Sequence, residues 1–156
     1  MASGESSVST LLKQLSSAAQ TLSDASNKLT EQIKEIESSL ASYNLGVVAW
    51  VELRRTSEEI APTVPYVYRV DRLGYSKKHG KWALYVSSEI EEVEHYESWL
   101  LRDAPRELRI LAVDAIPKLL AEMVSKANEL TAQVASKADR AKALAHSLRS
   151  KPKKGE

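Results

Sequence analysis

The chain contains no cysteine and no phenylalanine among its 156 residues. Without cysteine it can form neither a disulfide framework nor a thiolate metal site, and a cysteine nucleophile is excluded. Only five glycines are present, and none belongs to a phosphate-binding loop motif. No apolar run approaches the ~18–20 residues needed to span a bilayer, and the first residues lack the basic and apolar regions of a signal peptide. We therefore expect a soluble, cytoplasmic protein with no membrane partner.

The chain also has little net charge, with 22 basic against 21 acidic residues. This balance excludes the overall basic character of a dedicated nucleic-acid coat protein. The charge is uneven along the chain, because residues 89–104 are acidic and residues 137–156 are basic. Such segments can steer a partner, but they are also typical of a solvated surface.

The residues that usually carry chemistry are scattered. His79, His95 and His146 have no mutual spacing typical of a metal site, and the many serines lie outside any nucleophile elbow. We therefore predict no catalytic residue, no metal site and no cofactor, and hence a protein that is not an enzyme.

Two long apolar stripes are the strongest pattern present. Each advances by alternating steps of three and four residues, which is the spacing of a heptad seam. The first stripe contains Val8, Leu12, Leu15, Ala19, Leu22, Ser26, Leu29, Ile33, Ile36, Leu40 and Tyr43. The second contains Val113, Ile116, Leu120, Met123, Ala127, Leu130, Val134, Lys137, Ala141, Leu144 and Leu148. They predict a helix over 6–44, capped by Ser6 or Ser7 and ended at Asn44-Leu45-Gly46, and a second helix over 105–149.

Two prolines affect the predicted second helix, and both ends of the chain are predicted to lie outside the helices. Pro117 lies inside the second helix and predicts a kink or break at Ala115-Ile116, because proline removes a backbone hydrogen bond. Asp103 is the expected N-cap, with Pro105 in the first turn. Residues 1–5 and 150–156 are expected to be disordered.

Residues 46–104 change to a period of two, which predicts strands. The first strand starts at Val47, and residues 55–63 form a loop. A second strand covers Val64–Tyr75, with a possible bulge at Gly74, and Trp82 begins a third strand after a turn at 77–81. A short helix in the acidic segment follows, with Val93, Tyr96 and Trp99 at helical spacing.

The predicted fold is therefore α+β. A long antiparallel helical hairpin, resembling a coiled-coil stalk, is capped by a small three-stranded antiparallel β-meander. Pairing the two polar members of the stripes, Ser26 and Lys137, gives one possible register. The pattern does not decide whether the helices pair within one chain or between chains.

The stripes also predict a homo-oligomer, because flanking apolar residues widen each of them beyond what one partner helix covers. The candidate oligomerisation residues are Leu15, Leu22, Leu29, Ile33, Ile36, Leu130, Val134 and Leu144. Flanking alanines would also be present simply to favour helix formation.

The predicted sheet carries basic and aromatic residues on what we expect to be its open face and its hairpin tip. They are Trp50, Arg54, Arg69, Tyr75, Lys77, Lys78, Lys81 and Tyr85. We predict that this sheet binds an unidentified protein partner, by its face or by its edge. The alternative is a nucleic-acid-binding regulator that uses the hairpin lysines and the C-terminal Lys151, Lys153 and Lys154. Lysines that protect sheet edges and aromatics that fill a small core give the same pattern without any partner.

Overall fold

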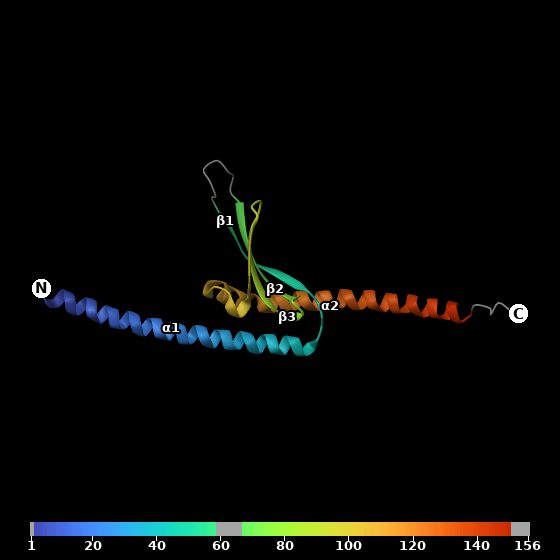
Figure 1. The fold of residues 1–156 in the computed structure, drawn as a ribbon, viewed down its shortest axis with the longest axis horizontal. Helices are drawn as coiled ribbons and strands as arrows, with labels where there is room; N and C mark the ends of the chain where they lie inside the picture. Colours follow the sequence, from blue (N-terminus) through green and yellow to red (C-terminus); the bar gives the residue numbers. More distant parts are fainter. Residues whose placement is uncertain (1, 59–66, 151–156) are drawn as a thin grey trace.

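The computed structural model describes residues 2–58 and 67–150 and confirms the α+β class. In chain order, a long helix precedes a four-stranded sheet and a second long helix follows it, and the sheet rises from the middle of an elongated molecule (Figure 1). The elements are α1 (Ala2–Tyr43), β1 (Ala49–Glu58), β2 (Val67–Lys78), β3 (Lys81–Ile90), β4 (His95–Leu100), the 3-10 turn η1 (Leu101–Asp103) and α2 (Arg106–Arg149). We call the sheet, η1 and the adjoining parts of the two helices the head.

The sheet is an antiparallel meander with the order β1-β2-β3-β4. The predicted turn joins β2 to β3, with His79 and Gly80 both at positive φ, as expected for a tight two-residue hairpin. The fourth strand replaces the predicted acidic helix, so that prediction was wrong. The chain turns at Glu92, at φ 66°, and His95–Leu100 then pairs with β3. The strand pairing satisfies backbone groups that a helix of one or two turns would leave unpaired at its ends.

Gly74 does not form the bulge that its position suggested, because β2 pairs in regular register with both neighbours there. A Cβ at Gly74 would lie 2.2 Å from the Trp50 indole ring, so glycine is needed to admit that ring. The irregularity lies in β1 instead, between Glu52 and Arg54. A bulge reverses the faces to which the following side chains point.

The two helices do not form the predicted antiparallel hairpin. They run in the same direction, and the second half of α1 lies beside the first half of α2 (Figure 1). Two sets of contacts fix this direction: Arg109 in α2 bonds to Ser26 and Thr30 in α1, and Leu45 beyond the end of α1 lies near Ala127 and Leu130. After β4 the chain passes through η1, whose Leu101 is buried in the core beside Ile33 of α1, and then enters α2 at Arg106.

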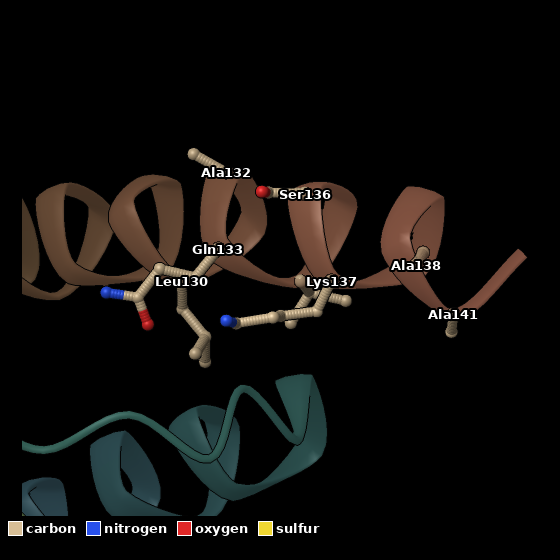
Figure 2. A pocket seen from close by; sticks show the side chains of 8 residues that line it. Leu130, Ala132, Gln133, Ser136, Lys137, Ala138 and Ala141 are labelled. Atoms are coloured by element: carbon tan, nitrogen blue, oxygen red, sulfur yellow. The ribbon is translucent and has the colours of Figure 1, made fainter. Parts of the chain in front are cut away.

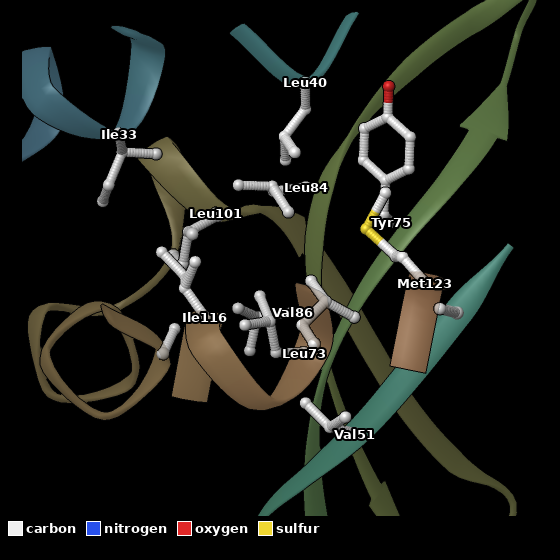
Figure 3. Packing of buried hydrophobic residues seen from close by; sticks show 14 of the residues in the cluster. Ile33, Leu40, Val51, Leu73, Tyr75, Leu84, Val86, Leu101, Ile116 and Met123 are labelled. Carbon is white, nitrogen blue, oxygen red and sulfur yellow. The ribbon is translucent and has the colours of Figure 1, made fainter. Parts of the chain in front are cut away.

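The core lies between the helices and one face of the sheet. Ile33 and Leu40 of α1, with Ile116 and Met123 of α2, converge on the sheet and on Leu101 of η1 (Figure 3). The sheet contributes Val51, Leu73, Leu84 and Val86. The apolar stripes are thus used for the core only where the helices overlap.

The helix ends differ from the predictions in detail. The helix α1 begins at Ala2, earlier than the predicted cap, and ends as predicted at Asn44, which has φ 49°. The residue before α2 is Pro105, without a side-chain cap, and Asp103 belongs to η1. The helix α2 continues through Pro117 without a break, because the buried Ile116 and Leu119 anchor it on either side. The predicted tail over 151–156, including Lys151, Lys153 and Lys154, and the start of the second strand before Val67 lie outside the described residues.

Candidate interaction surfaces

Each long helix leaves the head as a free arm. We call residues 4–25 of α1 the N-arm and residues 124–149 of α2 the C-arm. The two arms extend to opposite ends of the molecule (Figure 1). Their large apolar side chains are between 43% and 69% exposed: Val8, Leu11, Leu12, Leu15 and Leu22 in the N-arm, and Val124, Leu130, Val134, Leu144 and Leu148 in the C-arm. Single exposed apolar residues are ordinary, whereas a continuous exposed stripe makes each arm a candidate interaction surface.

The structure divides the candidate oligomerisation residues into two groups. Ile33 is fully buried, and Leu29 and Ile36 pack against the head core, so these three residues stabilise the fold of the single chain. The others lie in the arms and are exposed: Leu15, Leu22, Leu130, Val134 and Leu144.

Each arm carries an open groove on its apolar side. The groove of the C-arm, with a volume of about 770 Å³, is lined by Leu130, Val134, Ala138 and Ala141 together with polar neighbours. Leu130 and Lys137 point to the side of α2 on which α1 ends (Figure 2). The N-arm groove is lined by Ala18, Leu22 and Ala25, among others. Both grooves lie where one helix continues past the end of the other.

The sheet places the candidate partner-binding residues on two different faces. Directly paired residues share a face, so Trp50 opposite Gly74 and Lys78 opposite Lys81 lie with Tyr85 on the face away from the helices. The bulge turns Arg54 toward the helices, opposite Asp71. Strand alternation puts Arg69, Tyr75 and Lys77 on that same helix-facing side. Arg54 and Arg69 were predicted to lie on the open face. They lie on the helix-facing side instead.

On the open face, most of the predicted aromatic surface is already covered. The Trp50 ring lies over Gly74, and Tyr85 is only 9% exposed. The Lys78 ammonium lies 4.4 Å from the centre of the Tyr85 ring, a cation–π contact, and donates a hydrogen bond to Ser98. Trp50, Lys78 and Tyr85 thus stabilise the sheet surface itself.

Two exposed tyrosines at the other end of this face were missed from the sequence. Tyr68 is 45% and Tyr96 58% exposed, and the Arg55 guanidinium lies 5.6 Å from the centre of the Tyr68 ring. Val70, on the same face of β2 two residues after Tyr68, is fully buried. Tyr96 was assigned to a helix packed on the sheet. The alternation in His95–Leu100 was the signal that could have identified a strand with an outward-facing tyrosine.

Beside α2, the helix-facing side holds an ionic cluster around the buried Asp71 carboxylate. Arg54 donates to Asp71 at 2.6 Å and also to Glu107 in the first turn of α2. Both hydrogen bonds raise the pKa of the Arg54 guanidinium, and the one to Asp71 has the larger effect. Asp71 is only 1% exposed, and its Oδ1 has no hydrogen-bond partner among the described residues. Arg69 donates to Ser88 nearby at 3.0 Å. This cluster joins the sheet to the start of α2, which is a structural role.

A second carboxyl, the partly buried Glu37, joins α1 to the sheet. Glu37 accepts a hydrogen bond from the Leu84 amide of β3, at 3.1 Å, beyond the point where β4 stops pairing with β3. Burial raises the pKa of the Glu37 carboxyl, although this hydrogen bond opposes the rise. Burial, with a smaller contribution from the Glu37 charge, also raises the pKa of the Tyr75 hydroxyl, and Tyr75 stacks on Trp82.

Two further arginines of the sheet are paired with acids. Arg55 bonds to Glu52 and Glu91, and Arg72 bonds to Glu89. In the chain as described, residues 2–58 and 67–150, no three acidic or histidine side chains come together as a metal site. Neither described helix is long and apolar enough to cross a membrane.

Comparisons of this chain with protein-family models, with curated proteins and with solved structures gave no match.

Proposed function

We propose that this protein is a non-enzymatic, self-assembling interaction module. Its arms associate with other helices as a coiled coil, and its head presents a recognition face to a protein partner. The observation that carries this proposal is the exposure of ten large apolar side chains along the two arms.

The arms have no role in the fold of a single chain that would explain these side chains. The head core uses the stripes only from Leu29 to Leu40 in α1 and up to Ala127 in α2. Helices that remain isolated in water gain nothing from apolar side chains at heptad spacing, and most helix stability in proteins comes from packing such a face. Association of the arms gives the stripes a partner.

The open face of the sheet is the recognition surface in this proposal. Tyr68 and Tyr96 are exposed aromatic residues there, and aromatic residues are the commonest anchors at protein interfaces. The exposed Lys81 extends the surface toward the hairpin tip. The ion pairs of Arg55 and Arg72 surround it as a polar rim.

Nucleic-acid binding is the alternative function, and the arrangement of charges supports it less. It would need cations available to phosphate groups. Arg54, Arg55 and Arg72 bond to carboxylates, and Lys78 lies on Tyr85. Lys77 and Lys81 are exposed at the hairpin tip, which is a small basic patch for this purpose.

The first prediction tests assembly by light scattering of the whole chain at high micromolar concentration. We expect the wild type to have at least twice the monomer mass. The double variant Leu15→Asp, Leu144→Asp should be monomeric, because an unpaired charge buried in a helix seam costs several kcal/mol. The head should stay folded, because both residues are exposed in the single chain.

The matched control is Ser9→Asp, Ala143→Asp, which adds the same charges to the same helices on the sides away from the seams. This variant should keep the wild-type mass. A wild type that stays monomeric would refute the proposal, as would a control variant that dissociates as readily as the seam variant.

A further inference from the structure

We infer that the occupant of each arm is the opposite arm of a second copy of this chain. The N-arm of one protomer lies antiparallel along the C-arm of its partner, and a twofold axis repeats the contact at the other end. Leu12 faces Leu144 of the partner subunit. This inference rests on the proposed function, because it names the partner for the arms.

The direction of the helices selects this arrangement. The arms run in the same direction and extend to opposite ends of one molecule (Figure 1). A twofold rotation perpendicular to them reverses the direction and exchanges the ends. Each N-arm then meets a C-arm that runs the opposite way, and all four arms are covered in one closed dimer. Pairing N-arm with N-arm would leave both C-arms exposed.

The exposed side chains select the register. When Val8 faces Leu148, the seam continues with Leu12 on Leu144, Leu15 on Ala141 and Leu22 on Val134, and it stops before Ser26, which bonds to Arg109 of its own chain. Lys137 then faces Ala19, whose small side chain leaves space for the lysine stem to reach water. The register that pairs Ser26 with Lys137 lies one heptad away. It would place Ile33, which is fully buried, against Leu130, and it would leave Val8 and Leu12 beyond the end of α2.

Charge favours the pairing of unlike arms. The N-arm has two acidic residues and one basic residue, a net charge of −1, and the C-arm has five basic and two acidic residues, a net charge of +3. Two C-arms would repel each other, whereas an N-arm and a C-arm attract.

The area involved is sufficient for a stable dimer. Ten large apolar side chains in each protomer are exposed in the arms, and the twofold axis doubles that number. If each loses roughly 60 Å² of accessible surface, the dimer buries about 1,200 Å² of apolar area, which reaches the range of stable protein–protein interfaces.

The test uses the absence of cysteine in the chain. The variant Leu12→Cys, Leu144→Cys is oxidised with glutathione disulfide and analysed by non-reducing electrophoresis. In the inferred dimer each Leu12→Cys thiol faces a Leu144→Cys thiol of the partner subunit, so two disulfides close one covalent dimer. We expect more than about nine-tenths of the chain in this band and no larger species.

Two control variants make the result specific. The variant Ala19→Cys, Leu144→Cys would cross-link readily only in the register displaced by one heptad. The variant Leu12→Cys alone would cross-link readily only if two N-arms paired with each other. Both should cross-link at least ten-fold more slowly. Faster linkage of either control, or a ladder of larger species, overturns the inferred pairing while leaving self-assembly intact. A wild type that is monomeric in light scattering overturns the proposed function as well.

Discussion

At the scale of single residues, Glu37 shows how a partly buried side chain completes the sheet. It accepts the hydrogen bond of the Leu84 amide, which β4 is too short to reach. Burial raises its pKa above the ordinary value of 4.5, so the folded chain holds this proton more tightly than the unfolded chain. The stability that Glu37 contributes is therefore complete below about pH 4.5 and is lost as the pH rises through the folded pKa.

The prediction is that Glu37→Gln removes this pH dependence while keeping an acceptor for the Leu84 amide. At pH 7 the variant should be more stable than the wild type by less than about 1 kcal/mol. The ion pair between Glu37 and Arg102 contributes little stability, because its atoms are 3.9 Å apart and the arginine is exposed. Urea unfolding at several pH values measures the effect, with the exposed Glu35→Gln as control. A marked loss of stability at pH 7 would show that the charge itself is needed.

At the scale of secondary-structure elements, α2 tolerates a proline in its interior. Pro117 is exposed, while Ile116 and Leu119 beside it are buried. Their packing offsets the missing backbone hydrogen bond, and this tertiary effect is absent from the local sequence rules that predicted a break.

We predict that Pro117→Ala stabilises the chain by about 1–3 kcal/mol. The gain in helix propensity is up to about 3 kcal/mol, and the greater freedom of the unfolded chain without proline reduces it by roughly 0.4–1 kcal/mol. Urea unfolding followed by circular dichroism gives the difference. The neighbouring exposed Lys118→Ala should change stability by less than about 0.5 kcal/mol. A destabilised Pro117→Ala variant would mean that the core requires the backbone shape imposed by proline.

The turn, the end of α1 and the bulge show which local features could be predicted from sequence. The turn at His79-Gly80 and the end of α1 at Asn44 were predicted, because each depends on a residue that tolerates positive φ. The bulge after Glu52 was not, because no glycine or proline marks it. It moved Arg54 from the predicted recognition face into the cluster with Asp71.

At the scale of the whole molecule, the two helices pack parallel and not antiparallel as predicted. Heptad spacing identified which faces of α1 and α2 need partners, but it does not distinguish parallel from antiparallel packing. The residues that meet in the core, such as Ile33 and Ile116, could therefore not be paired from the stripes alone. The same stripes thus serve the core in their overlapping parts and remain exposed in the arms.

The last prediction separates the two functions proposed for the whole molecule. Most sheet cations are paired, so single- and double-stranded oligonucleotides should bind no tighter than about 10 µM at physiological salt, the level of non-specific contact. Fluorescence anisotropy measures this binding. The variant Lys77→Glu, Lys81→Glu should weaken it no more than Lys13→Glu, Lys118→Glu, which makes the same charge change outside the sheet. Submicromolar binding that is lost only in the hairpin variant, and that falls steeply with salt, would instead favour a nucleic-acid-binding regulator, because each phosphate contact releases condensed counterions.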